Sequence, residues 1–442
     1  MNNMSDMQFP NENREDKPTT FDIVQQSLAK RRAAERRFRW YGLGGIALGL
    51  AFLILLFADI AAKGYTAFEQ TQVKLDIFFD PAVLESSQAE DKEQALSRAD
   101  YNSLLKNTLR ELFPEARSRR EKKDLYALIS SGASFQLRKM VLQDNSLVGK
   151  TVSVWVPAND DVDMLFKGHI DRRVKQSDRR VNDRQLAWID RLVAENRIEK
   201  HFNKAFFTSG DSREPELAGI RGAAMGSLFT LVGTFLLSFP IGVATAVYLE
   251  EFAPVNRLTD LIEVNINNLA AVPSIVFGLL GLAMFINFFG LPRSTPIVGC
   301  LVLTLMTLPT IIIAGRASLK SVPPSIREAA LGMGASPLQT VFHHVLPLAM
   351  PGMLTGSIIG MARALGETAP LLMIGMVAFI VDIPHSFTEP STVLPVQIYL
   401  WADSPERAFV ERTSAAIMVL LIFLILMNGL AIYLRKRYER RW

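Results

Sequence analysis

Apolar runs of membrane length are the feature that most constrains this chain. A bilayer core about 30 Å thick needs roughly 20 consecutive apolar residues from a helix that crosses it. Inside hydrocarbon such a run must satisfy its own backbone groups, which favours the α-helix. The runs that reach this length are Tyr41–Ala62 and about Ile220–Tyr248, Leu261–Phe289, Thr295–Ala314, Leu348–Ile380 and Ala415–Leu434. The sequence therefore predicts an all-α six-helix transmembrane protein, with bends at Pro273 and Pro370 in the third and fifth runs.

Basic residues in the short flanks predict the orientation of these helices. The segments 30–40 ("KRRAAERRFRW") and 435–442 ("RKRYERRW") are strongly basic, and the loop after the fourth run carries Arg316, Lys320 and Arg327. Cytoplasmic loops carry such an excess of lysine and arginine. Both termini are therefore expected in the cytoplasm. A cleaved signal peptide is the alternative for the first run, but that run is longer than an ordinary signal and follows about 40 polar residues.

About 150 residues between the first two runs lack a membrane-length stretch and alternate between two patterns. Val73–Asp80 and Lys150–Pro157 alternate as strands do, whereas Tyr101–Phe113 and Arg184–Ile198 have helical periodicity. The single cysteine of the chain, Cys300, rules out an intrachain disulfide. We expect an inserted α+β extracytoplasmic domain that folds on its apolar core alone.

These observations divide the chain into parts with expected boundaries. The first 20 residues have no apolar period, which is typical of disorder, and the following basic helix is expected at the inner leaflet. The expected parts are a basic cytoplasmic segment 1–40, a first transmembrane helix 41–62, the α+β domain 63–217, a five-helix core 218–435 containing a loop 323–347, and a basic tail 436–442.

The loop 323–347 is predicted to form two short helices joined by a bend. In "SIRE" we expect Ser325 to cap the first helix and Glu328 to reach back to it. Gly334 suits the left-handed end of that helix. Ser336 then caps a second helix with Gln339 at the reciprocal position.

Apolar side chains of this loop, Leu331, Met333 and Leu338, are expected on the cytoplasmic surface, where a partner can bind them. On local physics alone, a simple connection between two spans explains the loop equally well. His343 and His344 are adjacent on a helix and do not chelate a metal together, so we expect no metal site.

The longer pattern of the loop resembles the EAA signature of ABC importer permeases. "EAA" at Glu328–Ala330 is followed after three residues by Gly334 and ends in "LP" at Leu346–Pro347, with His344 where isoleucine is usual. In that family this loop docks into a groove of a separate ATPase subunit. The residues that the resemblance assigns to ATPase coupling are Glu328, Ala329, Ala330, Leu331, Gly334, Leu338 and Pro347.

Four further stretches resemble the PstA-type permease of the bacterial phosphate-specific ABC importer. They are "LEEFAP" from Leu249, "NINNLAAVPSIVFGLLGL" from Asn265, "TLPTII" from Thr307 and "ARALGETAPLL" from Ala362. The similarity extends from about Ile220 to the last residue. The segment 63–217 resembles the extra amino-terminal domain found in a subset of longer PstA proteins, whose role is not known.

Two charged residues inside the fifth run, Arg363 and Glu367, call for a functional explanation, since charges at membrane depth are costly. Four residues apart, they are expected to pair on one helix face. A phosphate could replace Glu367 beside Arg363, because guanidinium binds oxyanions through two parallel hydrogen bonds. Thr368 and the pair Asn265 and Asn268 are further candidates for the substrate pathway. A purely structural salt bridge is the alternative.

The resemblance implies a permease subunit of an ATP-driven inorganic phosphate importer in the bacterial inner membrane, with no catalysis by this chain. It implies no cofactor bound here and ATP with Mg²⁺ on the partner ATPase. The implied partners are a PstC-like permease, a PstB-like ATPase homodimer, a PstS-like phosphate-binding protein and a possible phosphate-signalling regulator, with no nucleic acid. The alternatives are a permease for sulfate or molybdate, and a membrane sensor that uses 63–217 for sensing.

Overall fold

The computed structural model describes residues 20–84 and 92–438. The segment 1–19, expected to be disordered, and the end of the basic tail, 439–442, lie outside the described residues. The chain divides into two compact units, 1–59 and 60–442. Helix α1, Thr20–Gly64, holds most of the described part of the first unit. The basic segment and the first apolar run therefore form one continuous helix.

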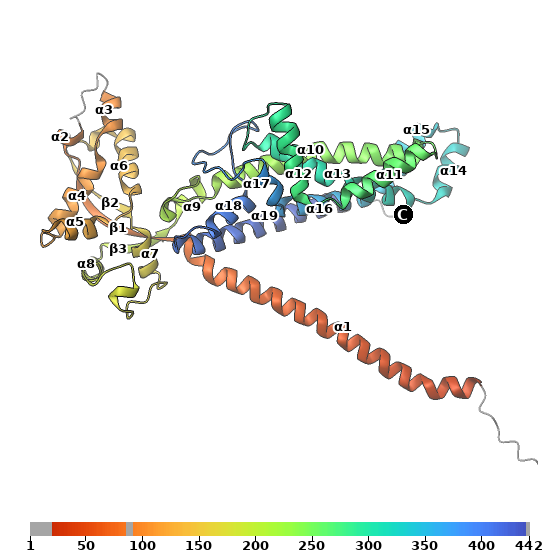
Figure 1. Ribbon diagram of the computed structural model, residues 1–442, viewed down its shortest axis with the longest axis horizontal. Helices are drawn as coiled ribbons and strands as arrows, with labels where there is room; N and C mark the ends of the chain where they lie inside the picture. Colours follow the sequence, from red (N-terminus) through yellow and green to blue (C-terminus); the bar gives the residue numbers. More distant parts are fainter. Residues whose placement is uncertain (1–19, 85–91, 439–442) are drawn as a thin grey trace, which may run out of the picture. The chain divides into compact units, whose positions relative to one another are not determined.

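Within the second unit, an antiparallel sheet of three strands follows α1 (Figure 1). Its strands are β1, Glu69–Phe78, β2, Thr151–Pro157, and β3, Ile198–Phe202. β1 lies in the centre, and Val73 is opposite both Val156 and Ile198. Alternate residues of β1 are buried, as expected for a strand with one covered face. The sequence predicted β1 and β2 but not β3.

Helices lie around this sheet (Figure 1). Together with the sheet they make up residues 69–208 of the second unit, which we call the α/β region. They are α2 (Pro81–Leu84), α3 (Lys92–Arg98), α4 (Tyr101–Leu112), α5 (Arg119–Tyr126), α6 (Gly132–Gln143), α7 (Asp160–Phe166), α8 (Asp183–Ala194) and α9 (Lys204–Thr208). α4 agrees with the predicted helix. The predicted helix 184–198 ends earlier, because Asn196 adopts a positive φ of 51° and the chain turns into β3.

The remaining helices form the helical core. They are α10 (Arg221–Val247), α11 (Arg257–Ala270), α12 (Ser274–Gly281), α13 (Pro296–Lys320), α14 (Pro324–Gly332), α15 (Pro337–Thr340), α16 (Leu346–Gly366), α17 (Ala369–Met373), α18 (Leu394–Ala402) and α19 (Ala408–Tyr438). Three π-helical segments extend α10, α12 and α15, and they are η5 (Tyr248–Phe252), η6 (Leu282–Phe288) and η7 (Val341–Val345).

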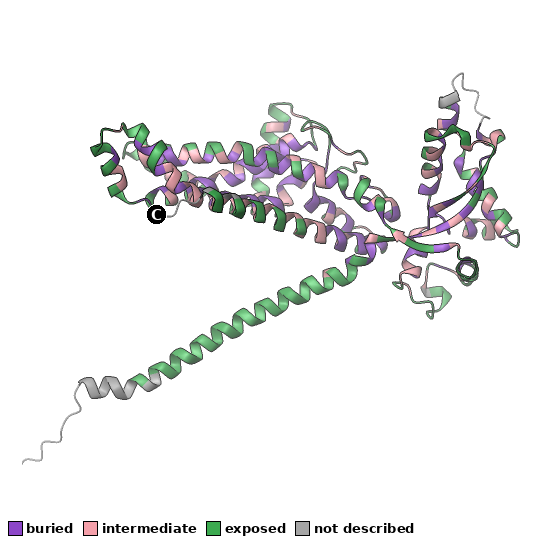
Figure 2. Ribbon diagram, turned by 180° about the vertical axis from the view of Figure 1, so that it is seen from behind, coloured by how far each residue is buried: buried purple, intermediate pink, exposed green. Residues whose placement is uncertain are grey.

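Helix α13 is the centre of the helical core and packs against α10 and α16. Small residues allow the backbones to approach closely, as is common between membrane helices. A Cβ added to Gly356 of α16 would lie 2.2 Å from Cβ of Ala314, and one on Gly242 of α10 would lie 2.6 Å from Ile311. Buried residues gather where the helices face one another and beneath the sheet (Figure 2).

Five described helices are long and apolar enough to cross a membrane, or six if one bent pair counts as a single span. The bent pair confirms the bend predicted at Pro273 in the third run: α11 and the α12–η6 segment meet at 102°. Pro273 stands at this break and caps α12. Proline disfavours the helical conformation of the residue before it and lacks a backbone N–H.

The fifth run is also shorter than predicted. Its helix α16 ends at Gly366, only the short α17 follows, and no helix reaches the expected end at Ile380. Thr368 caps α17, with Pro370 in the first turn of that helix. Proline is favoured in the first turn of a helix, where it starts a new element instead of continuing the old one.

Candidate functional site

The loop predicted to couple with an ATPase begins differently from the sequence expectation. Helix α14 starts at Pro324, with Pro323 as its cap and no side-chain capping bond. Ser325 therefore lies inside the helix, and the predicted reciprocal pair of Ser325 with Glu328 is wrong. Pro324 at the first helical position has its φ preset for helix, which starts the helix one residue before the serine can cap it. The Glu328 side chain remains exposed.

The turn after α14 matches the prediction. Gly334 has φ +89° and donates its N–H to Leu331 O at 2.9 Å, while Ala335 N–H reaches Ala330 O at 3.1 Å. This pair of bonds is a Schellman motif, which satisfies the last carbonyls of a helix. Ser336 and Gln339 form the predicted capping box at the start of α15.

The candidate coupling residues fall into two groups: some are exposed on the surface of the loop, and others are buried or half-buried against the helical core. Leu331 is 48% exposed, Leu338 is 58% exposed, and Met333, between them in sequence, is 78% exposed. Ala330 is buried, and Pro347 lies half-buried in the first turn of α16. The loop therefore presents an apolar surface beside exposed Glu328 and Ala329. Such a surface is suited to binding another protein.

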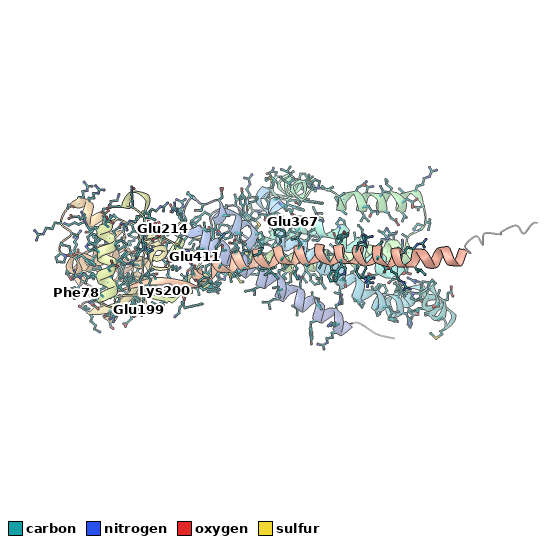
Figure 3. The ribbon with its side chains drawn as sticks, turned by 90° about the horizontal axis from the view of Figure 1, so that it is seen from below. Phe78, Glu199, Lys200, Glu214, Glu367 and Glu411 are labelled. Carbon is teal, nitrogen blue, oxygen red and sulfur yellow. The ribbon has the colours of Figure 1, made fainter. Side chains whose placement is uncertain are left out.

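Arg363 and Glu367 approach each other at the end of α16. Arg363 Nε lies 3.4 Å from Glu367 Oε1, and their side chains are 49% and 19% exposed. The helix ends at Gly366, so Glu367 is its cap in extended conformation and reaches back from the loop. The expectation of one shared helix face is therefore wrong, although the two side chains do meet. Glu367 is labelled beside the helical core in Figure 3.

The other predicted pathway residues are not gathered around Arg363. Thr368 is half-buried and caps α17, whereas Asn265 and Asn268 are exposed on α11. Asn265 donates to Leu261 O at 2.7 Å. In the described part of the chain, no hydrogen bond joins either asparagine to Arg363, Glu367 or Thr368. The bend after α11 separates that helix from the α12 segment, which is the one that packs on α17.

The sequence did not predict an ion-pair cluster that joins the loop 323–347, here called the coupling loop, to the helical core. Arg327 of α14 binds Glu251 through two nitrogens, at 2.6 Å and 3.2 Å. Arg316 of α13 binds Glu250 at 3.3 Å and also pairs with Glu263 of α11. We call these five residues the inner clamp. The sequence did contain a signal for this cluster. The two glutamates of "LEEFAP" follow an apolar run, and Arg316 and Arg327 follow another apolar run whose flank is predicted on the same side of the membrane.

A second buried cluster joins the α/β region to α19. Lys167, after α7, has no exposed side-chain surface and binds Asp163 at 2.8 Å and Glu411 at 2.7 Å. His169 lies 3.7 Å from Glu411. Nearby Glu216 is buried, and burial raises its pKa from 4.5 to about 7. No sequence pattern placed these residues together, since Lys167 and Glu411 are 244 positions apart.

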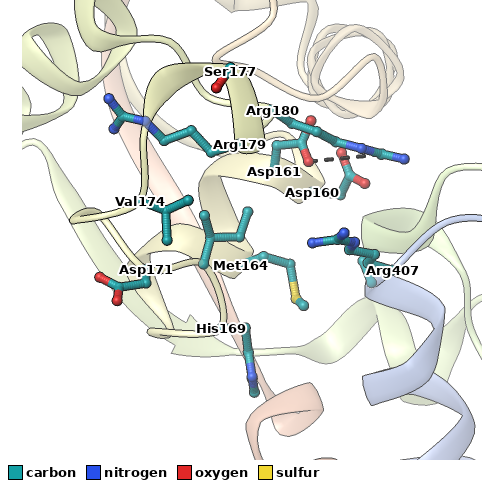
Figure 4. A pocket seen from close by; sticks show the side chains of 12 residues that line it. Asp160, Asp161, Met164, His169, Asp171, Val174, Ser177, Arg179, Arg180 and Arg407 are labelled. Atoms are coloured by element: carbon teal, nitrogen blue, oxygen red, sulfur yellow. Dashed lines mark ion pairs between the residues drawn. The ribbon is translucent and has the colours of Figure 1, made fainter.

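A cavity of about 370 Å³ lies beside this junction, between the segment 160–180 and the start of α19 (Figure 4). Asp161, His169, Arg180 and Arg407 are among the residues that line it. Burial raises the pKa of Asp161 to about 6. Arg180 lies 3.9 Å from Asp161 and 2.6 Å from Glu406, so much of the charge in the cavity is already paired.

Two family models match different parts of the chain. Residues 238–441 match "Binding-protein-dependent transport system inner membrane component". Residues 25–176 match a domain of unknown function, DUF3333. Residues 177–237, which include the last part of the α/β region and most of α10, lie between the two matches.

Individual relatives agree with the second model. A probable ABC transporter permease protein, YqgI, of Bacillus subtilis is 38% identical over 167 residues, which are 38% of this chain and 56% of that protein. The phosphate transport system permease protein PstA 1 of Mycobacterium tuberculosis is 33% identical over 228 residues, 50% of this chain and 72% of that protein. PstA of Haemophilus influenzae is 29% identical over 222 residues, covering 50% and 77%.

Solved structures similar to this chain include an inward-facing MetNI methionine ABC transporter. It is 21% identical and covers 50% of this chain and 96% of its own, with a TM-score of 0.42. An ABC transporter involved in alginate import is 14% identical and covers 50% and 80%, with a TM-score of 0.39.

Proposed function

The chain belongs to the binding-protein-dependent transport inner membrane components, and among them to the PstA-type permeases, and we propose that it is the permease subunit of an ATP-driven inorganic phosphate importer. The observation that carries the proposal is the 33% identity with PstA 1 of Mycobacterium tuberculosis over 72% of that protein. The relatives are permeases rather than enzymes, so ATP hydrolysis is assigned to a partner subunit.

The proposed membrane arrangement has six spans, with the bent α11–α12–η6 pair as one of them. Both termini lie in the cytoplasm, and 63–217 lies outside as the α+β insertion. The basic segments 30–40 and 435–442 support this orientation, because lysine and arginine are retained on the cytoplasmic side. The five expected parts of the chain follow the same plan, with the loop 323–347 on the inner face.

In this arrangement the coupling loop binds the ATPase. Leu331 and Leu338 offer apolar contact area, and Glu328 and Ala329 stand beside them on the exposed side of α14. Gly334 supplies the sharp bend between α14 and α15. Ala330 and Pro347 connect the loop to the helical core. ATP with Mg²⁺ belongs to the partner, and no cofactor is assigned to this chain.

The transport pathway is proposed to pass Arg363. Its side chain is about half exposed, which leaves it accessible to an anion or to a second permease subunit. Glu367 compensates its charge when no substrate is present, and an arriving phosphate oxyanion takes the place of the carboxylate. Thr368 is next to this pair in the chain, whereas Asn265 and Asn268 are assigned to a separate part of the pathway.

The proposed assembly contains a homologous PstC-like permease, two copies of a PstB-like ATPase and a PstS-like extracytoplasmic phosphate-binding protein. A regulator of phosphate signalling is a further candidate partner. The exposed apolar residues of α11 and α12, such as Leu258, Val264 and Leu279, suit contact with lipid or with the second permease.

Uptake by the reconstituted assembly tests this function. Vesicles that contain the complete complex and ATP are given labelled phosphate, sulfate or molybdate in parallel, with a hydrolysis-deficient ATPase as the control. Accumulation of phosphate alone supports the proposal. Accumulation of sulfate or molybdate without phosphate would replace it with the other-oxyanion permease. No ATP-dependent accumulation of any of the three would reject an oxyanion importer.

A further inference from the structure

We propose that the inner clamp is the mechanical link through which the coupling loop moves α10 and α11, an inference that rests on the proposed function. Its five members, Arg316, Arg327, Glu250, Glu251 and Glu263, are positioning residues and touch no substrate. Together they connect four separate elements at one end of the helical core: α14, α13, η5 and α11.

The clamp is the strongest polar attachment of α14 to the core. Arg327 donates to both oxygens of Glu251 and also to the carbonyls of Leu319 and Val322, at 3.0 Å and 2.8 Å. The planar guanidinium holds the carboxylate in one orientation, unlike a single ammonium contact. Its bonds to Leu319 and Val322 fix α14 against the end of α13. A displacement of α14 must therefore pull on η5, or these bonds must break.

Apolar contact alone would hold α14 loosely. Ala330 is the one buried residue of α14, and Ile326 is the one residue of this helix that packs against the neighbouring cluster that includes Val247, Leu319 and Val322. The Glu251 side chain is only 9% exposed and that of Arg327 is 24% exposed. Water therefore screens this pair less than an ordinary surface pair.

The second half of the clamp extends the connection to α11. Arg316 lies on α13 and bridges Glu250 of η5 to Glu263 of α11, with side chains 17%, 16% and 33% exposed. α11 is the arm that bends by 102° from the α12–η6 segment, and α12 packs against α17 beside Glu367. Movement of the loop is thereby connected through charged contacts to α11, and from α11 through the bend in the chain to the α12 segment that packs on α17.

Local helix geometry supports a movable joint at this place. The clamp glutamates Glu250 and Glu251 lie in the π-helical turn η5, and the last part of the loop, before α16, forms a second π-helical turn, η7. Such turns interrupt the regular hydrogen bonding of an α-helix and occur frequently at functional sites. A rigid loop that is joined by ion pairs to η5, and that continues along the chain through η7, can move without unfolding the long helices behind it.

Charge exchange between Arg327 and Glu251 tests the link in the reconstituted complex. We expect R327E and E251R, each alone, to lower the amount of phosphate transported per ATP hydrolysed by about tenfold. The double variant R327E/E251R is expected to recover part of the loss, because it restores an ion pair between the same two elements but not the hydrogen bonds from Arg327 to the carbonyls of Leu319 and Val322. Lys320→Gln is the control: Lys320 lies 3.7 Å from Glu250 of the clamp, but its side chain is 60% exposed, so water screens this contact and its loss is expected to change the ratio little.

Hydrogen exchange of the α14 amides provides a readout that does not depend on the substrate. We expect faster exchange in each single variant and recovery in the double variant. Unchanged transport per ATP in both single variants would overturn the proposal, as would a double variant that assembles with its ATPase but recovers neither measurement. If the wild-type complex transports no phosphate while the exchange data show recovery, the proposed substrate fails and the clamp stands as a structural link.

Discussion

Lys167 Nζ lies 2.7 Å from Glu411 Oε1, with the lysine side chain completely buried and the glutamate side chain 4% exposed. This pair joins the α/β region to the first turn of α19. The same lysine binds Asp163, which also accepts a hydrogen bond from the backbone N–H of Thr71. The α/β region is therefore fixed to a helix long and apolar enough to cross a membrane, and it is attached by more than the chain connections at its two ends.

Replacing Lys167 with methionine tests the strength of this junction. The change leaves Asp163 and Glu411 buried without their shared cation, so we expect the free energy of unfolding to fall by about 3 kcal/mol. Denaturant titration of the protein in detergent measures the change. Asp190→Asn is the control, because its pair with Arg172 is 59% and 44% exposed and is expected to matter little. Equal losses in both variants would contradict a special role for the buried pair.

The bend after α14 depends on backbone conformation alone. Among the described residues, no atom apart from the adjoining backbone lies within 4 Å of a Cβ added to Gly334 or Gly332, but Gly334 has φ +89°. Gly334→Ala is therefore expected to destabilise the loop by about 1–2 kcal/mol. Gly332→Ala is the matched control and is expected to stabilise α14, since alanine favours helix.

Hydrogen exchange over residues 323–340 distinguishes these two variants. We expect faster exchange with Gly334→Ala and equal or slower exchange with Gly332→Ala. A parallel uptake assay is expected to show a loss for the first variant only. If both variants exchange and transport like the wild type, a left-handed residue at position 334 is not needed for the bend.

The raised pKa of Glu216 predicts that the stability of the folded protein depends on pH. In the folded protein the Glu216 carboxyl group keeps its proton up to about pH 7, whereas in the unfolded chain it loses the proton near pH 4.5. The folded state therefore binds more protons between these values, and its stability falls as the pH rises through this window. The shift corresponds to roughly 3 kcal/mol in total. Unfolding measured at several pH values should show this slope in the wild type and a shallower one in Glu216→Gln. Parallel curves for the two proteins would refute the assignment.

Substitutions of Arg363 and Glu367 distinguish a role of this pair in transport from a purely structural ion pair. If an oxyanion takes the place of Glu367, Arg363→Gln should reduce phosphate uptake much more than Glu367→Gln, and Arg363→Lys should be impaired by about tenfold at limiting phosphate because lysine lacks the two-pronged geometry. A structural bridge predicts similar losses for Arg363→Gln and Glu367→Gln, with both explained by reduced protein in the membrane. Uptake normalised to the amount of assembled complex decides between them.

Local sequence signals anticipated those elements whose causes are local. The apolar runs located α10, α13 and α19, and alternation located β1 and β2. Gly334 and the Ser336–Gln339 box were predicted correctly because a turn or cap needs only a few neighbouring residues. The capping role of Ser325 was wrong for an equally local reason: Pro324 initiates the helix first.

Other features depended on residues that are far apart in the chain. Pro273 predicted a bend after α11, but neither its angle of 102° nor the early end of α16 followed from hydropathy, which measures how apolar a run is and not how it turns. The inner clamp and the Lys167–Glu411 junction join segments separated by up to 244 positions. Such ion pairs form only where packing brings desolvated charges together.

The sequence by itself determined that the chain contains membrane helices, a separate α/β region and an exposed loop of recognisable pattern, because periodicity, hydropathy and capping act over short distances. Only the tertiary structure decided which charges from distant segments meet, how sharply the third span bends and how the α/β region is attached to α19. Those outcomes follow from side-chain packing between distant segments, and no short window of sequence records it.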